Sequence, residues 1–480
     1  MDFSNFLYMG QEIGLLILFV ILFLYDTFCT ANGRKYFQTI AVSGFAVLTL
    51  YGFLPQICNQ SFLVGEVFGG MYVSSDMTIL MKNILNMATL IVFLQSRQWL
   101  QTGETLHRQG EFYTITLSTL LGMYLMVSAG NFMMLYVGME TASLPLACLT
   151  AFNKYKEQSA EAGVKYILIS ALSSGVMLFG LSFLYGGLGS MYFADMAAGM
   201  QLSTLTVLGF VFFLGGLGFK LSLVPFHLWT ADVYEGAPTS VTAYLSVVSK
   251  GAAAFALLFV LYQVFGKVLG VWEPILWWLA AITITLGNLF AIRQTDIKRF
   301  FAFSSISQAG YIILGIISAS DQGMAALVFY VLVYLFSNLA AFGVIAAVEQ
   351  QSNGDTRIAA FNGLYKSNPK LATVMTLAVF SLGGIPIFAG FFSKLYIFFS
   401  LGAQGQWILF FIAALNTVIS LFYYLLIVKA MWFQESAENV SSFKTDTSNR
   451  ISLVLCTAGI IAVGLMSFIY EYIQTISFGV

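Results

Sequence analysis

The sequence contains few charged residues. Only 9% of its 480 residues are Asp, Glu, Lys or Arg, whereas a soluble domain carries roughly a quarter. Hydrophobic residues make up 59%, and the mean hydropathy is +0.85. The longest polar stretches, around 95–111, 349–370 and 434–450, are too short to bury a core of their own. The composition therefore predicts an all-α polytopic membrane protein, and a net charge of −1 gives no reason to expect a nucleic-acid partner.

Cysteine and histidine are also scarce. The four cysteines and two histidines lie far apart, with no CxxC or Cys/His spacing. This argues against haem, an iron–sulfur cluster or structural zinc in the chain. There is also no Walker motif, no dinucleotide-binding GxGxxG and no Ser–His–Asp arrangement. We expect no cofactor or metal in this chain, whose energy source would lie elsewhere. The first apolar run lacks a basic leader, so we expect no cleaved signal peptide.

Long apolar runs are abundant. A helix needs about 20 apolar residues to cross the hydrocarbon core of a bilayer. With that window we predict about fourteen transmembrane helices. Their centres lie near residues 19, 48, 86, 120, 141, 175, 215, 251, 283, 309, 336, 385, 418 and 463.

The 21 Lys and Arg residues are distributed unevenly among the predicted loops. Fifteen fall in loops after odd-numbered spans, Lys82 and Lys267 fall on the opposite side, and four fall inside spans. The fifteen are Arg34, Lys35, Arg97, Arg108, Lys154, Lys156, Arg293, Lys298, Arg299, Arg357, Lys366, Lys370, Lys429, Lys444 and Arg450. Because basic loops stay in the cytoplasm, both termini are expected to face away from it.

Five charged residues lie inside the predicted spans. Glu140, Lys220, Lys250 and Lys394 are deep in the fifth, seventh, eighth and twelfth spans. A charge there costs at least about 2.5–3.5 kcal/mol on insertion scales, so it normally faces a partner or a water-filled cavity. Lys165 lies near the cytoplasmic start of the sixth span, where its long side chain can reach the interface. We treat all five as candidate site residues.

Helix breakers interrupt two of the same spans. Pro225 follows Lys220, and Gly383, Gly384 and Pro386 precede Lys394. Backbone groups freed by such breaks are tolerated at membrane depth only where protein or water satisfies them, and broken helices mark ion sites in transporters. His227 would lie about two turns beyond Lys220 if helix continued through the break. The pattern predicts a hydrated cavity containing these side chains.

Each feature also has a purely structural interpretation. A proline can serve only as a kink, and a buried lysine only as half of an ion pair. His227 can cap a helix end, and Lys165 can anchor the sixth span at the interface. The combination favours a functional interpretation. One carboxylate and three lysines lie near mid-depth, and each adds its own free-energy cost of insertion, which four purely structural residues would not justify.

Lysine and glutamate in this setting suit proton transfer. Desolvation lowers the pKa of a buried lysine, and a nearby carboxylate raises it again. A lysine that alternately meets and loses its carboxylate therefore changes its proton affinity. Glu140 is the expected modulator of Lys220, with Lys250 and Lys394 passing the proton onward.

Three stretches carry a family resemblance. They are GFKLSLVPFHLWTADVYEGAPTSVTAYLSVVSK, SAEAGVKYILISALSSGVMLFGLSFLYGGLGS and GGIPIFAGFFSKLYIF. They resemble the antiporter-like, proton-translocating subunits of respiratory complex I, in the form typical of the subunit N branch. Ala231 departs from that branch, which often has proline there. Lys394 fits the N or L branches rather than M, and the chain lacks the long lateral helix of the L branch.

The resemblance implies a fold and a set of site residues. It implies one membrane domain, 1–480, with two inverted five-helix repeats, each with one broken helix, in spans 7 and 12. Spans 1–3 would occupy 1–110, the repeats 111–266 and 271–433, and span 14 would occupy 450–480. The implied relay consists of Glu140, Lys165, Lys220, Lys250 and Lys394, with His227 from our own analysis.

The resemblance also implies a function. The chain would move protons as a membrane subunit of an NADH:quinone oxidoreductase, driven by electron transfer in other subunits. NAD, FMN, iron–sulfur clusters and quinone would be bound by those subunits. Partners would be other membrane subunits and the lipid bilayer, in a bacterial inner membrane. The alternatives are a subunit of a multi-subunit cation/proton antiporter and a purely structural membrane scaffold.

The loop charges predict the orientation of the chain. A fluorescent or phosphatase reporter fused after Val480 is expected to report a non-cytoplasmic location, because the basic loops hold the odd-numbered connections inside. A reporter in the 434–450 stretch serves as the control and is expected to read cytoplasmic. A cytoplasmic signal from the C-terminal fusion would contradict either the span count or the orientation.

Overall fold

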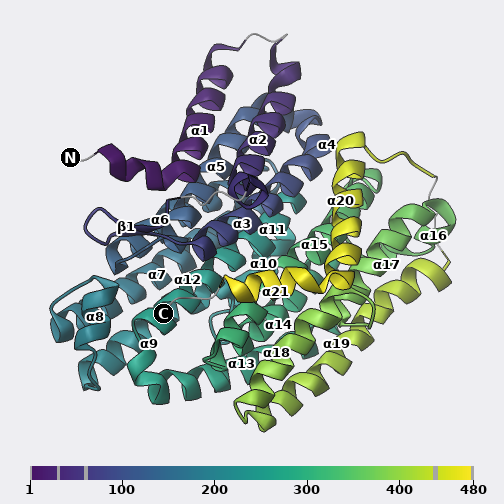
Figure 1. Ribbon diagram of the computed structural model, residues 1–480. Helices are drawn as coiled ribbons and strands as arrows, with labels where there is room; N and C mark the ends of the chain where they lie inside the picture. The colour runs from purple at the N-terminus through teal and green to yellow at the C-terminus, as the bar shows by residue number, and fades with distance from the viewer. Residues whose placement is uncertain (1–2, 30–32, 59–62, 436–441, 477–480) are drawn as a thin grey trace.

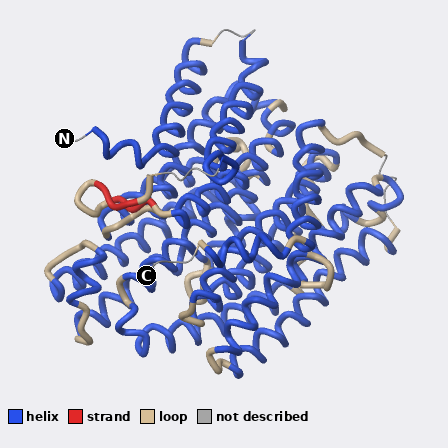
Figure 2. Tube along the Cα trace, in the orientation of Figure 1, coloured by secondary structure: helices blue, strands red, loops and turns tan. Residues whose placement is uncertain are grey.

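The computed structural model describes residues 3–29, 33–58, 63–435 and 442–476, and helices dominate them (Figures 1 and 2). The first half contains α1 Gly10–Phe28, α2 Phe37–Cys58, α3 Asp76–Gln95, α4 Arg97–Leu100, α5 Gln109–Val127, α6 Phe132–Thr150, α7 Glu157–Leu188, α8 Phe193–Gly199, α9 Thr204–Leu221, α10 Leu228–Gly236, α11 Thr239–Tyr244 and α12 Lys250–Gln263. The second half contains α13 Leu269–Ala291, α14 Ile297–Ile317, α15 Asp321–Gln351, α16 Leu364–Ser367, α17 Pro369–Gly383, α18 Ala389–Ala403, α19 Trp407–Phe433, α20 Thr447–Leu465 and α21 Ser467–Thr475.

Short elements connect these helices. A two-stranded antiparallel hairpin, β1 Gly65–Val67 with β2 Tyr72–Ser74, precedes α3 and pairs Val67 with Tyr72. A π-helical segment, Leu245–Ser249, joins α11 to α12 without a break. Short 3-10 turns cover Phe3–Met9, Gly33–Tyr36, Gly103–Arg108, Gly266–Val268 and Ile358–Phe361.

The chain is a multi-pass membrane protein. Twelve helices in the described part are long and apolar enough to cross a bilayer. The two remaining predicted centres, 120 and 385, fall on α5 and on the link between α17 and α18. The pair α17 and α18 are apolar but individually too short for a full span. The all-helical membrane fold is confirmed, whereas the count of fourteen stays a prediction.

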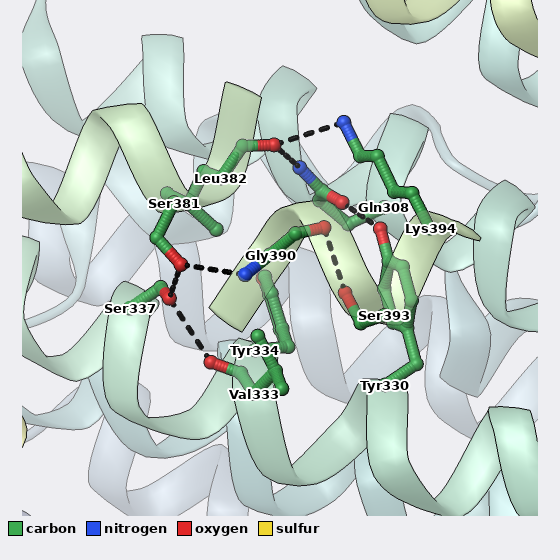
Figure 3. A pocket seen from close by; sticks show the side chains of 10 residues that line it. All are labelled: Gln308, Tyr330, Val333, Tyr334, Ser337, Ser381, Leu382, Gly390, Ser393 and Lys394. Carbon is green, nitrogen blue, oxygen red and sulfur yellow. Dashed lines mark hydrogen bonds between the residues drawn. The ribbon is translucent and has the colours of Figure 1, made fainter. Parts of the chain in front are cut away.

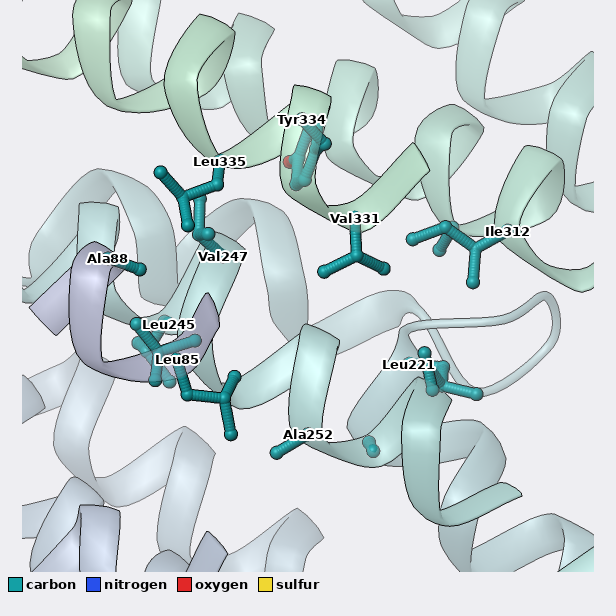
Figure 4. Close-up of a cluster of buried hydrophobic side chains, with 14 of the residues drawn as sticks. Leu85, Ala88, Leu221, Leu245, Val247, Ala252, Ile312, Val331, Tyr334 and Leu335 are labelled. Atoms are coloured by element: carbon teal, nitrogen blue, oxygen red, sulfur yellow. The ribbon is translucent and has the colours of Figure 1, made fainter. Parts of the chain in front are cut away.

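Burial separates inner helices from outer ones. The most apolar window of Thr239–Gln263 is entirely buried, and α14, α15 and α3 are nearly so. Helices α1, α7 and α19 bury only about a third of theirs and expose leucine, valine and phenylalanine, as lipid-facing helices do. Figure 4 shows the inner packing, where Leu85 and Ala88 of α3 lie beside Leu245 and Val247.

Glycine permits close packing of α5 against α6 near Glu140. A side chain at Gly122 of α5 would stand 2.4 Å from the backbone nitrogen of Ala142 and 2.6 Å from the carbonyl of Gly138, both on α6. Small residues allow such close backbone approach between membrane helices, where dispersion contacts drive packing. Because Glu140 lies between these contact points on α6, the α5–α6 contact fixes its height in the bundle.

Two helices are broken, as the sequence indicates. Helix α9 ends at Leu221 with Ser222 in the left-handed conformation, φ 60°, and α10 starts only at Leu228. Helix α17 ends at Gly383 with Gly384 at φ 84°, and α18 starts at Ala389. Our assumption of a helix running from Lys220 to His227 is therefore wrong, because six residues of irregular chain separate α9 from α10.

We expect two five-helix repeats in 111–266 and 271–433, preceded by spans 1–3 in 1–110 and followed by span 14 in 450–480. Each expected repeat contains one broken helix, α9–α10 in the first and α17–α18 in the second.

Two of the lysines assigned to loops are buried inside helices. Lys82 is within α3 and only 1% exposed, and its ammonium contacts Glu12 of α1 at 2.5 Å. Lys298 is in the first turn of α14, where it is 3% exposed and donates to the carbonyl of Ala237 at 2.6 Å. The predicted centres near 86 and 309 agree with these two helices, so the charge of each lysine rather than a misplaced span led to its assignment to a loop.

The α5–α6 contact generates a prediction. Gly122→Val is expected to destabilise the protein by about 1–3 kcal/mol, because a branched side chain forces the two backbones apart. Thermal unfolding in detergent measures the loss. The matched control is Gly175→Val, since Gly175 of α7 is exposed with nothing within 4 Å of the added carbon. Equal stability of the two variants would show that the close contact contributes nothing.

Candidate functional site

Lys220 lies in the last turn of α9 and is 5% exposed. Its ammonium donates to the hydroxyl of Tyr166 on α7 at 2.9 Å. The same ammonium stands 5.2 Å from the centre of the Tyr166 ring and 5.5 Å from that of Phe219. The lysine is thus held by one hydroxyl and two aromatic faces rather than by an ion pair.

Glu140 is half-buried on α6 and does not pair directly with Lys220. Among the described residues, no ion pair within 4.0 Å involves Glu140, and its Oε1 is buried without a hydrogen-bond partner. Glu140 is still close enough to Lys220 and to Tyr166 for an electrostatic interaction with both. The predicted carboxylate and lysine are therefore not in contact, and they interact over a longer distance.

Side chains satisfy the backbone at the first break. The indole of Trp229 donates to the carbonyl of Phe219 at 3.1 Å, and the amide of Val224 donates to the hydroxyl of Thr283 at 3.0 Å. His227 is the N-cap residue of α10, is 9% exposed and has a buried Nδ1 without a partner among the described groups. It also interacts electrostatically with Lys250. His227 thus borders the break, on the side toward the next lysine.

Lys250 is the first residue of α12, directly after the π-helical segment, and is 2% exposed. Its ammonium donates to the hydroxyl of Ser305 on α14 at 2.7 Å and stands 5.5 Å from the Tyr234 ring. The Tyr234 hydroxyl is buried with no partner in the described part of the chain. Tyr234 and Tyr166 interact electrostatically, so Tyr234 lies between Lys220 and Lys250.

Lys394 caps the second break. Its ammonium donates to the carbonyls of Leu382 and Gly383, the last residues of α17, at 3.0 and 3.3 Å. It also stands 4.8 Å from the ring of Tyr311. Figure 3 shows Lys394 reaching back over the break to Leu382, whose carbonyl also accepts from Gln308 at 3.3 Å. Lysine and break thus form one structural unit.

A polar face of α14 connects Lys250 with Lys394. Ser305 accepts from Lys250, and Gln308, one turn later, shares the Leu382 carbonyl with Lys394. Tyr334 interacts with Ser305 and also lines a small cavity of about 10 Å³ together with Gln308 and Lys394. That space is about what one water molecule needs. The two lysines are therefore joined through hydroxyl, amide and a water-sized space.

Lys165 belongs to a different cluster. Its side chain is 37% exposed and forms ion pairs with Glu161 at 2.6 Å and with Asp232 at 2.5 Å. Asp232 also pairs with Arg299 of α14 at 2.7 Å, and Arg299 pairs with Glu235. This network ties α7, α10 and α14 together. The structure thus brings Lys220, Lys250 and Lys394 into one polar series and leaves Lys165 at its margin.

The uncharged members of this series were not predicted from the sequence. They are Tyr166, Tyr234, Ser305, Gln308, Tyr330 and Tyr334. One signal for them is present in the run SSISQAGY, 304–311, which places three serines and a glutamine in an otherwise apolar span. The tyrosines give no such signal, because tyrosine is common in membrane helices.

The arrangement can hold and pass protons. Each lysine faces hydroxyl or carbonyl oxygens, and the spaces between them are polar. In the described residues, no group of three or more His, Cys, Asp or Glu side chains is placed to hold a metal ion.

Comparisons with known proteins agree with one another. A family model described as NADH:quinone oxidoreductase/Mrp antiporter, transmembrane, matches residues 129–420. The chain is 67% identical over 481 residues to a protein of Azobacteroides pseudotrichonymphae named NADH-quinone oxidoreductase subunit N, covering 100% of this chain and 99% of the relative. It is 51% identical to a protein of the same name from Phocaeicola vulgatus, covering 99% of each.

Solved structures show the same fold. A chain in the structure of respiratory complex I from Thermus thermophilus superposes with a TM-score of 0.81 at 27% identity, covering 98% of this chain and 100% of that one. A chain of the Mrp complex from Dietzia reaches a TM-score of 0.85 at 20% identity, covering 99% and 97%. The latter likeness concerns the fold alone.

The contact of Lys394 with the break generates a prediction. Lys394→Met is expected to speed hydrogen–deuterium exchange of the amides of 384–390 about tenfold or more. The reason is that a hydrogen bond from a charged group contributes about 1.5–3 kcal/mol, and the variant removes the donor to Leu382 and Gly383. Lys370→Met, at the exposed start of α17, the helix that ends with Leu382 and Gly383, is the control and is expected to leave exchange unchanged. Identical exchange in both variants would contradict the capping role.

Proposed function

We propose that this chain, which belongs to the NADH:quinone oxidoreductase subunit N family, carries protons across the membrane as one subunit of a redox-driven assembly. The observation that supports this best is the series of three buried lysines, Lys220, Lys250 and Lys394. Each is almost fully buried, and within the described part of the chain none has a carboxylate within ion-pair distance. Hydroxyl and carbonyl oxygens accept from their ammonium groups instead. Charges of this kind inside a membrane mark ion pathways.

In the proposed relay, Glu140 controls the proton affinity of Lys220. A carboxylate that approaches a buried lysine stabilises its ammonium form, and one that withdraws lets the proton leave. In the present arrangement Glu140 interacts with Lys220 without touching it, and Tyr166 holds the lysine instead. A shift of α6 relative to α9 would exchange Tyr166 for Glu140 as the nearest partner, and the Lys220 proton would move accordingly.

The proton then passes from Lys220 toward Lys394. Tyr166, Tyr234 and the unpartnered Nδ1 of His227 line the step to Lys250. Ser305, Gln308 and the small cavity beside Tyr334 line the step from Lys250 to Lys394. The role of Lys165 is to hold α10 in place through Asp232.

The energy for this transfer comes from other subunits. In the proposed assembly those subunits bind NAD, FMN, iron–sulfur clusters and quinone, and this chain holds no redox centre. Its partners are further membrane subunits, and its location is the bacterial inner membrane with both termini outside the cytoplasm. The 67% and 51% identity to proteins named NADH-quinone oxidoreductase subunit N favours this assembly over a cation/proton antiporter.

The relay is tested by replacing hydroxyls and charges along it. We expect Lys220→Ala to abolish transfer through this chain and Ser305→Ala to slow it about tenfold. The hydrogen bond from Lys250 to Ser305 contributes about 1.5–3 kcal/mol, and 1.4 kcal/mol corresponds to a factor of ten in rate. Proton uptake per electron in membrane vesicles containing the intact complex measures both effects.

The matched control is Ser307→Ala. Ser307 lies on the same helix and is equally buried, but its hydroxyl has no partner among the described groups. It is expected to pump normally. A normal proton-to-electron ratio in fully assembled Lys220→Ala would contradict the relay. Copurification of this chain without redox subunits would contradict the assembly and favour the antiporter alternative.

A further inference from the structure

A second buried charge pair lies outside the lysine series. The ammonium of Lys82 on α3 contacts the carboxylate of Glu12 on α1 at 2.5 Å, and their side chains are 2% and 4% exposed. Lys82 also donates to the hydroxyl of Tyr72, on β2, at 2.9 Å. Helices α1 to α3 precede both expected repeats, so none of these groups belongs to the relay proposed above.

Stability alone does not account for this pair. Burying two charges costs more desolvation free energy than their attraction commonly returns, and well-packed apolar residues often serve better. The hydrogen bonding is incomplete as well, because Glu12 Oε2 and Gln11 Oε1 are buried without partners among the described residues. Intramembrane ionisable residues with unused acceptors are by default functional groups.

A small cavity leads from the pair toward the surface. Glu12 and Lys82 line a space of about 10 Å³ together with Tyr8 and Gly10, about enough for one water molecule. Tyr8 and Gly10 are partly exposed, whereas Glu12 is buried. A water in this space can accept from or donate to the free oxygen of Glu12 and reach the surface beside Tyr8.

On the inner side, polar residues of α3 continue from the pair. Lys82, Asn86 and Thr89 are spaced by four and three residues, so they share one helix face. All three are buried. The hydroxyl of Tyr124 on α5 donates to the Asn86 side chain, and the Lys82 ammonium stands 5.7 Å from the Tyr124 ring. This face gives α3 a polar stripe that points into the bundle.

The stripe reaches Tyr244 on α11, six residues before Lys250 in the chain. The hydroxyl of Tyr244 on α11 bonds to that of Thr119 at 2.7 Å and lies near Thr89. Tyr124, whose hydroxyl donates to Asn86, interacts electrostatically with both Glu12 and Tyr244 and thus lies near the pair and near α11. Tyr244 directly precedes the π-helical segment that leads into Lys250.

We propose that Glu12 and Lys82 form a second proton-binding site, which connects the Lys250 region with the surface beside Tyr8 by way of Tyr244 and Tyr124. The inference rests on the function proposed above. A proton arriving along the stripe binds the Glu12 carboxylate while Lys82 keeps its charge, and the Glu12 proton then leaves to water in the cavity. The loop charges place this surface on the non-cytoplasmic side, so the site serves proton release.

The test compares two tyrosines of α5 in the intact complex. Tyr124→Phe removes the bridging hydroxyl and is expected to lower the proton-to-electron ratio as far as Lys220→Ala does. The matched control is Tyr113→Phe, since Tyr113 is fully buried on the same helix and its hydroxyl has no partner among the described groups. It is expected to pump normally. Both variants are expected to assemble normally on native gels, and Tyr113→Phe is expected to transfer electrons at an unchanged rate.

Glu12→Gln with Lys82→Gln tests the pair itself without leaving one charge unpaired. The double variant is expected to lower the ratio in the assembled fraction, whereas a purely structural pair would lower only the amount assembled. Unchanged ratios in Tyr124→Phe and in the double variant would overturn the inference. Lys220→Ala in the same experiment separates this inference from the proposed function. If Lys220→Ala lowers the ratio while the other variants do not, only the second site is refuted. If Lys220→Ala also leaves the ratio unchanged, the proposed function is refuted as well.

Discussion

Polar groups inside a bilayer have to find their partners within the protein, and the rest of this structure depends on that constraint. The two broken helices expose backbone groups at depth, and Trp229, Thr283 and Lys394 satisfy them. Lys394 caps the second break, so the hydrogen bonds between its ammonium and the freed carbonyls reduce the free-energy cost of burying both. The same constraint explains why α12, α14 and α15 lie in the middle (Figure 1), where helix breaks and charges are shielded from lipid.

The fold and the presence of charged residues inside its helices were accessible from the sequence, because both follow from large free-energy terms. Glu140, Lys220, Lys250 and Lys394 stand out against apolar spans, and glycine and proline mark both breaks. The geometry of those breaks was not accessible. Pro225 indicated an interruption, and a helix cap was one of the interpretations of His227, but the sequence did not indicate that six residues would separate α9 from α10. Such details depend on tertiary partners such as Thr283, which lies 59 residues from Val224 in the chain.

The uncharged members of the site were harder to predict, because serine and tyrosine cost little in a membrane helix. Ser305 and Ser307 lie two residues apart, are both buried and look alike in the sequence, yet only Ser305 meets a lysine. Glu12 and Lys82 were missed for another reason. They lie near helix ends, where a hydropathy window assigns charges to loops, and their contact joins residues 70 positions apart.

The π-helical segment Leu245–Ser249 has a consequence for the register of α12. A π-helical turn amounts to one residue inserted into an α-helix, and every residue after it is rotated by about 100°. The direction in which Lys250 points therefore depends on the number of residues in the π-helical segment as well as on their identity. A chain one residue shorter here, with every functional side chain retained, would aim the same lysine away from Ser305. This part of the molecule therefore tolerates insertions and deletions less well than substitutions.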